Sequence, residues 1–194
     1  MFRSLLVPIA ALVLAASGFA QVETWKIDPN HTAAQFSVRH MGISTVRGAF
    51  TKVSGDVAYD PKDVTKTTIQ AAIETASVDT RVSMRDDDLR AHYFEVAKYP
   101  TITFKSKQAQ AAGEGKLKVT GDLTIHGVTK EVVLDVDGPS EAIHDQKGNF
   151  HMGASASTKI SRKEFGIENN PGVIGDEIQI TIDTEMIKPG PSAK

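Results

Sequence analysis

Strict alternation of apolar and polar residues is the dominant pattern along most of this chain. In residues 34–40, Phe36 and Val38 lie on one face while Ser37 and Arg39 lie on the other. Successive side chains of a β-strand point to opposite faces, so this segment is expected to be a strand with one buried face. The same alternation recurs in residues 68–73, 116–125, 131–136, 150–156 and 178–183.

Short segments rich in turn-forming residues separate these predicted strands. They lie at residues 59–63, 112–115, 126–129 and 146–149. Parallel neighbours need a crossover of about a dozen residues or more, so connections this short favour antiparallel pairing. About eight such strands with one apolar face can form either a sandwich or a closed barrel, and the alternation leaves both open.

Two segments depart from the strand pattern. Residues 83–96 carry apolar positions at helical spacing, and Ser83 and Asp86 have the spacing of a capping box, which predicts a short helix. Residues 161–172 have the composition of a half-turn and loop before the last strand. Both segments are expected to cover one end of the sheet structure.

The amino terminus has the pattern of a signal peptide. Arg3 precedes an apolar run over residues 5–16, and Gly18 and Ala20 supply the small residues of a cleavage site after Ala20. The run is shorter than the roughly 20 residues of a membrane-spanning helix, so we expect export to the periplasm without stable membrane insertion. This divides the chain into a signal peptide at 1–20, one domain at 21–187 and a flexible tail at 188–194.

Composition removes several classes of function. The chain has no cysteine, and its net charge of -2 lacks the basic excess that nucleic-acid binding needs. Its six histidines show no metal-ligand spacing, and serine-hydrolase, phosphate-loop and dinucleotide motifs are absent from the sequence. The sequence therefore predicts a protein that is not an enzyme, with no cofactor, no metal site and no nucleic-acid partner.

Small residues occur among the large apolar ones on the inward face. Gly121 and Ala154 are examples, and in a barrel of about eight strands such a mixture can leave a hollow. It can equally fit a tapering, packed core. If the barrel is hollow, Gly121→Leu or Ala154→Phe is expected to fill the interior without harming the fold.

Six segments, in order along the chain, resemble the YceI-like family of bacterial exported proteins. The longest is residues 31–50, HTAAQFSVRHMGISTVRGAF. The others are residues 56–61, 86–94, 98–104, 121–130 and 160–166. Together they extend over nearly the whole chain after the signal peptide.

The resemblance implies an all-β fold with one short helix, an extended antiparallel β-barrel of lipocalin type with an apolar interior cavity. It also implies a lipid ligand: a polyisoprenoid, quinone or prenyl precursor bound in the barrel and transported through the periplasm. Two alternatives stay open, an envelope stress-response protein with a packed barrel and an enzyme acting on an isoprenoid substrate. The oligomeric state is open as well, with a homodimer as one option.

The ligand-binding site is assigned from the inward positions of the matching segments and from groups expected near the opening. Leu89 and Phe94 are predicted as a lid, and His40 and Arg162 as polar groups beside the opening. The predicted ligand-binding residues are Phe36, Val38, His40, Phe50, Ile73, Leu89, Phe94, Ile102, Phe104, Leu123, Ile125, Arg162 and Ile180.

Overall fold

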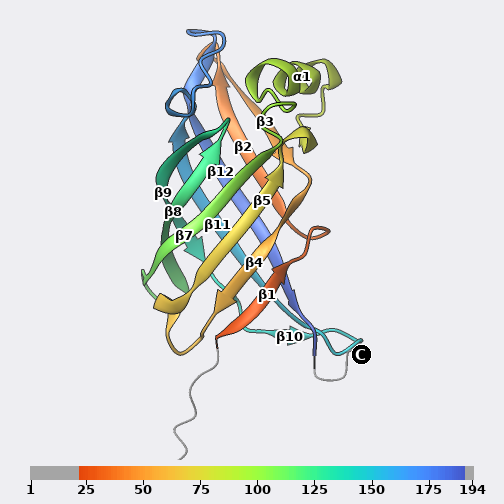
Figure 1. The fold of residues 1–194 in the computed structure, drawn as a ribbon, viewed down its shortest axis with the longest axis vertical. Coiled ribbons are helices and arrows are strands. Elements are labelled where there is room, and N and C mark those ends of the chain that lie inside the picture. Colours follow the sequence, from red (N-terminus) through yellow and green to blue (C-terminus); the bar gives the residue numbers. More distant parts are fainter. Residues whose placement is uncertain (1–21, 191–194) are drawn as a thin grey trace, which may run out of the picture.

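The computed structural model describes residues 22–190 (Figure 1). The predicted signal peptide at 1–20 and residues 191–194 of the predicted tail lie outside the described residues. Strands β1 to β12 form one sheet with antiparallel pairing throughout. The strands are β1 (Glu23–Ile27), β2 (Ala33–His40), β3 (Ser44–Phe50), β4 (Val53–Tyr59), β5 (Thr68–Glu74), β6 (Val78–Asp79), β7 (Thr101–Ala111), β8 (Lys116–Ile125), β9 (Val128–Asp137), β10 (Ile143–His144), β11 (Phe150–Ser161) and β12 (Ile174–Lys188).

The helical elements are short. Helix α1 (Ser83–Asp88) continues into a π-helical turn, η3 (Leu89–Tyr93). The 3-10 turns are η1 (Val64–Lys66), η2 (Thr75–Ser77) and η4 (Lys163–Phe165). Among the described residues, no helix has both the length and the apolar character needed to cross a membrane.

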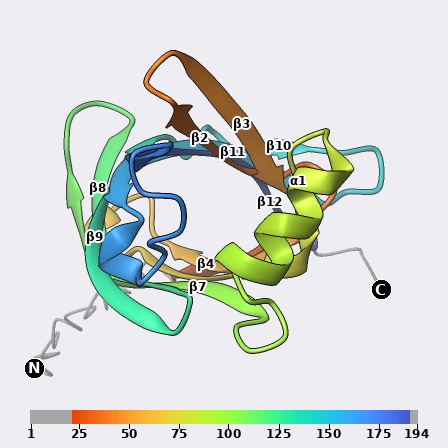
Figure 2. The same cartoon turned by 90° about the horizontal axis from the view of Figure 1, so that it is seen from above.

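The sheet closes into a barrel. Its pairing order runs β11-β9-β8-β7-β5-β4-β1-β12, and β12 pairs back onto β11 from Phe150↔Lys188 to Ser161↔Glu177. Eight strands therefore form a continuous ring, seen from above in Figure 2. The barrel prediction is confirmed, and the sandwich alternative is wrong. Strand β12 also runs one residue into the predicted tail.

Strand β12 is long enough to pair with two successive strands along one edge. Its residues 178–183 pair with β2, and Met186 and Ile187 pair with β1. Strands β3 and β6 continue outward from β2. Three segments lie together at one end of the barrel (Figures 1 and 2): the β2–β3 hairpin, α1 and the loop that follows β11.

The predicted alternation becomes inside and outside of the barrel. In β8, Leu117, Val119 and Leu123 are buried, while Lys116 and Lys118 are exposed. Two joined clusters of buried side chains result, a large one over most of the barrel and a smaller one around β8 and β9. A strand can bury one face in this way because its side chains repeat every two residues.

The helix differs from its prediction in extent and in capping. The helical segment ends at Tyr93, and Ser83 makes no capping hydrogen bond. The buried Asp86 carboxylate accepts hydrogen bonds from the Thr80 backbone N–H at 2.8 Å and from Thr80 Oγ1 at 2.5 Å. The capping-box prediction is therefore wrong, because Asp86 bonds to the turn before the helix.

Two glycines on the inward face, Gly48 and Gly121, do not border open space. A Cβ atom on Gly48 would lie 2.5 Å from Cζ of Phe36, and one on Gly121 would lie 2.5 Å from Cζ of Phe104. The Gly121 position is also 2.6 Å from the backbone oxygen of Lys105, which cannot move as a side chain can. The prediction that Gly121→Leu leaves the barrel intact is therefore wrong, since a Phe104 ring already fills that space.

Gly121→Ala is expected to lower the free energy of unfolding by about 1–3 kcal/mol, because the new methyl group overpacks the Phe104 ring and the Lys105 carbonyl. Urea unfolding followed by circular dichroism measures it. Gly153→Ala is the matched control, since its nearest neighbouring atom would be 3.7 Å away. The control should stay within about 0.5 kcal/mol of the wild type. Equal midpoints for the two variants would contradict the packing argument.

Candidate binding cavity

A cavity of about 650 Å³ runs through the interior of the barrel. Aliphatic and aromatic side chains from all eight barrel strands line it. The alanines Ala34, Ala71, Ala154 and Ala156 are among them. The interior is therefore hollow, and the alternative of a solidly packed barrel does not describe it.

All thirteen residues predicted for the binding site line this cavity. They come from β2, β3, β5, β7, β8, β12, the helical segment and the turn after β11. The structure thus brings them together around one space. That they contact a ligand stays a prediction.

Other lining residues were not in the predicted set. They include Val53 and Val57 of β4, and Val132, Leu134 and Val136 of β9. A period-two signal was present, because these residues occupy every second position of their strands, although apolar Val133 and Ala58 interrupt the alternation with polar neighbours. These lining residues belong to β4 and β9, two strands from which no site residue was predicted.

The β2–β3 hairpin, α1 and the 163–173 loop, which Figure 2 shows together at one end of the barrel, all contribute residues to the cavity lining. Four lining residues there are exposed: Ser44, Asp88, Asn170 and Val173. Toward the opposite end, the lining includes the buried residue Met186. We call the first end the mouth and the second the closed end.

Aromatic rings from different elements meet on the wall near the mouth. The Phe50 ring lies 5.7 Å from the Phe36 ring and 5.5 Å from the Phe94 ring, between centroids. Phe94 follows η3, so the helical segment packs its apolar side directly on β3. Leu89 and Phe94 both line the cavity, and their role as a lid stays a prediction.

Hydrogen bonds tie the helical segment to the loop on the other side of the mouth. Asn170 Nδ2 donates to the buried Tyr93 hydroxyl at 2.6 Å, and Asn169 Nδ2 donates to the His92 carbonyl at 3.1 Å. Neither element belongs to a barrel strand. Their mutual contacts give the mouth a defined shape.

Arg162 lies beside the mouth, as predicted, and is only 4% exposed. Its guanidinium donates to the carbonyls of Ile167, Ile174 and Gly175 at 2.7, 3.1 and 2.9 Å. Buried charges need such partners, since an unpaired one costs several kcal/mol. Arg162 therefore holds the loop that follows η4. His40 is partly buried and also lines the cavity.

The Asp176 carboxylate fixes the start of the same loop. It accepts hydrogen bonds from Ser161 Oγ at 2.8 Å and from the Lys163 N–H at 3.1 Å. The Ser161 hydrogen bond, followed by the Lys163 N–H and the positive charges of Lys163 and Arg162, lowers the pKa of Asp176 from its ordinary value. The ionised form is therefore the one the fold stabilises.

Asp176→Asn is expected to lower the free energy of unfolding at pH 7, and the difference from the wild type is expected to shrink in acid. A carboxylate whose pKa is lower in the folded state stabilises fully above its unfolded pKa, near 3.8, and loses that contribution as pH falls through the folded pKa. Urea midpoints of both proteins at pH 7, 5 and 3 measure this.

Asp137→Asn is the matched control. The Asp137 side chain is exposed, and its carboxylate has no hydrogen bond or ion pair within residues 22–190. That variant should follow the wild type at each pH. A constant Asp176→Asn deficit from pH 7 to 3 would contradict the role given to the ionised carboxylate.

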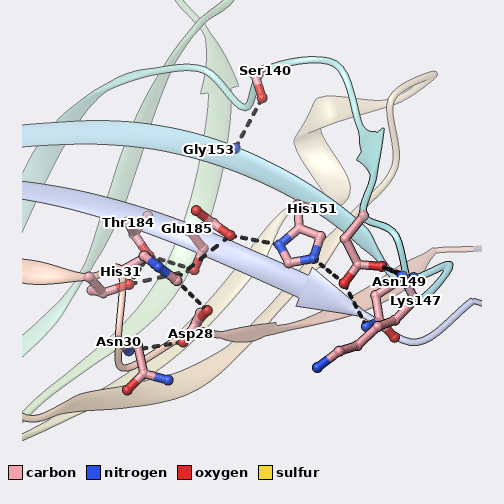
Figure 3. Close-up of polar contacts among 12 residues, drawn as sticks. Asp28, Asn30, His31, Ser140, Lys147, Asn149, His151, Gly153, Thr184 and Glu185 are labelled. Atoms are coloured by element: carbon pink, nitrogen blue, oxygen red, sulfur yellow. Dashed lines mark hydrogen bonds and ion pairs between the residues drawn. The ribbon is translucent and has the colours of Figure 1, made fainter. Parts of the chain in front are cut away.

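Titratable side chains of the β1–β2 turn, β11 and β12 come together on the outer face of the barrel wall (Figure 3). Hydrogen bonding to Asp28 raises the pKa of His31, and hydrogen bonding to Glu185 and then Asp145 raises the pKa of His151. Hydrogen bonds, chiefly from Asn149, lower the pKa of Asp145. Sequence analysis did not predict this cluster, because its members are far apart along the chain.

A closed antiparallel barrel around an apolar cavity with one open end is an architecture suited to holding apolar ligands. The YceI-like domain family matches residues 25–186, and this chain belongs to that family. The predicted resemblance is thereby confirmed, together with the barrel fold it implied.

Relatives match over nearly the full chain. A UPF0312 protein of Vibrio cholerae serotype O1 is 33% identical over 171 residues, 87% of this chain and 90% of the relative. A UPF0312 protein of Serratia proteamaculans is 34% identical over 182 residues, 92% of this chain and 94% of the relative.

Two solved structures have the same fold. The crystal structure of Burkholderia cenocepacia BcnA matches with a TM-score of 0.72 and 25% identity, covering 82% of this chain and 98% of that one. A polyisoprenoid binding domain from Saccharophagus degradans matches with a TM-score of 0.63, covering 87% of this chain and 100% of that one. At 17% identity, the second likeness shows the fold alone.

Proposed function

We propose that this protein binds a long-chain apolar lipid of the polyisoprenoid type, such as a quinone or prenyl precursor, in the barrel cavity. We further propose that it carries this lipid through the periplasm without acting on it chemically. The observation that carries the proposal is the hollow of about 650 Å³ with apolar walls. The barrel shared with a polyisoprenoid binding domain supports the choice of ligand class.

The size of the hollow favours an occupied interior. An empty apolar cavity is unfavourable, because its lining side chains lose the van der Waals contacts that a filled interior would give them. Water gains little there, because the walls offer it few hydrogen-bonding partners. An apolar ligand removes most of this penalty.

Burial of the chain alone supplies ample binding free energy. Each CH₂ group withdrawn from water contributes about 0.8 kcal/mol, so a chain of several prenyl units approaches the affinity ceiling of about 18–21 kcal/mol. A polar head group then has little to add. We expect selectivity to follow the length and shape of the chain.

Exposed apolar side chains concentrate at the mouth. Of the eight large apolar side chains that are exposed among the described residues, five lie on the segments around it: Met41, Ile43, Val82, Met84 and Val173. Single exposed apolar residues are common on protein surfaces, so the informative point is that most of these lie on segments at the same end. This concentration supports uptake of an apolar chain at this end.

The two alternative functions receive less support. An enzyme acting on an isoprenoid needs polar groups converging on one point inside the cavity, whereas the described lining is mostly aliphatic and aromatic. Arg162, the buried cation among them, already donates to three backbone carbonyls. A stress-response protein with a packed barrel would not need the hollow.

Ala154→Phe is expected to weaken retention of a fluorescent polyprenyl analogue by about tenfold or more, a change of about 1.4 kcal/mol or more, because the ring takes space from the ligand. The melting temperature of the delipidated variant should stay near that of the wild type. Val133→Phe is the control, since Val133 is 44% exposed on the outside of β9. A wild type that retains no analogue, or an Ala154→Phe variant that retains as much, would contradict the proposal.

Native mass spectrometry of protein isolated from its own periplasm tests transport and processing together. We expect a chain beginning at Gln21, with one lipid of polyisoprenoid mass released on collisional activation. Detection of a chain that retains Met1 would argue against export. A periplasmic chain without a lipid adduct, under conditions that preserve such adducts on a known carrier, would argue against the carrier function.

A further inference from the structure

Three potential metal ligands meet on the outer face of the barrel wall (Figure 3). Asp28 follows β1, His31 precedes β2, and Glu185 lies near the end of β12. His31 Nδ1 is 2.8 Å from Asp28 Oδ2 and 4.0 Å from Glu185 Oε1. One ligand atom from each residue lies within 4.8 Å of the other two. Imidazole nitrogens and carboxylate oxygens are both ligands that zinc accepts.

A second layer of hydrogen bonds holds Glu185 in place. His151 Nδ1 lies 2.6 Å from Glu185 Oε1, and His151 Nε2 lies 3.2 Å from Asp145 Oδ2. Asp145 is itself fixed by the backbone N–H groups of Lys147 and Asn149, both at 2.8 Å (Figure 3). In metal sites, partners of this kind orient the carboxylates and imidazoles that bind the ion.

The carboxylates of the cluster have no lysine or arginine partner among the described residues. The carboxylates of Asp28, Glu185 and Asp145 are only 13%, 35% and 29% exposed. Within residues 22–190, none of the three makes an ion pair with a lysine or arginine. Elsewhere the barrel commonly pairs its acids with lysine, as in Lys107 with Asp122. Partly buried carboxylates without a lysine or arginine partner are neutralised either by a protonated imidazole or by a bound cation, and this cluster offers the ligand atoms for the second.

We propose that Asp28, His31 and Glu185 form a binding site for a divalent transition-metal ion of the zinc type, and that His151 orients Glu185. Ligand bonds of about 2.1 Å at tetrahedral angles place ligand atoms about 3.4 Å apart. This distance lies between the 2.8 Å from His31 Nδ1 to Asp28 Oδ2 and the 4.0 Å from His31 Nδ1 to Glu185 Oε1. His31 is 62% exposed, so its ring can move to meet the ion. Water completes the fourth position, as in sites with three protein ligands.

The ion would join parts of the chain that are distant in sequence. It would link the β1–β2 turn to β12, and through His151 and Asp145 to β11 and the segment beside β10. The site lies on the outer face of the barrel wall, apart from the cavity lining, so this proposal does not depend on the lipid-carrier function. It departs from the sequence-based prediction of no metal site, which rested on spacing along the chain.

Zinc titration of the full processed chain, after chelator stripping and chelator removal, tests the site. Equilibrium dialysis against ZnCl₂ with elemental analysis should give one zinc per chain, and zinc should raise the melting temperature. Asp28→Asn, His31→Gln and Glu185→Gln should each weaken binding by at least tenfold. His151→Gln removes only the orienting contact and should weaken it by about 10- to 100-fold.

His92→Gln is the matched control. His92 Nδ1 lies 2.8 Å from Asp88 Oδ1, so it forms the same kind of histidine–aspartate pair, but outside the cluster and on the exposed helical segment. This variant should bind zinc as the wild type does. Circular dichroism of each zinc-free variant establishes whether it folds. If a variant does not fold, the absorption spectrum of Co²⁺ bound to the wild type reports whether the ion has nitrogen and oxygen ligands.

Three results would overturn the proposal. The first is no saturable zinc binding by the wild type up to millimolar zinc. The second is undiminished binding by the folded Asp28→Asn, His31→Gln and Glu185→Gln variants. The third is an equal loss in His92→Gln, which would indicate adventitious binding to surface histidines. Loss confined to the cluster variants supports the site.

Discussion

Closure of the sheet at the β11–β12 ladder is the constraint on which the rest of the structure depends. The ladder runs without a break from Phe150↔Lys188 to Ser161↔Glu177, and it joins the two ends of the eight-strand order into a ring. Once eight strands are closed, the width of the interior is set by the backbone. The inward side chains can then only decide how much of that space is filled.

The interior is filled unevenly. Phenylalanine rings cover the backbone at Gly48 and Gly121, while alanines such as Ala71 and Ala154 leave the neighbouring space open. Large residues thus pack against the barrel wall, and small residues leave the hollow. The cavity results from this distribution of side-chain volume around a ring of fixed width.

The mouth and the outer face of the barrel wall differ in physical character. Segments outside the barrel strands form the mouth and carry exposed apolar side chains. The buried Arg162 and the partly buried Asp176 fix the loop between β11 and β12. The outer face of the wall carries carboxylates and imidazoles in mutual contact. An apolar ligand and a cation would therefore meet the protein at separate places.

The sequence by itself determined which face of each strand is buried, because the two-residue repeat of a strand is a local property. That repeat, with the family resemblance, placed residues such as Phe104 and Ile180 on the cavity wall. Only the tertiary structure decided that Phe104 fills the space above Gly121, that Asp86 bonds to Thr80, and that His31 meets Glu185. Such contacts depend on strand register, on the direction of turns and on closure of the barrel. None of these is contained in the local order of residues.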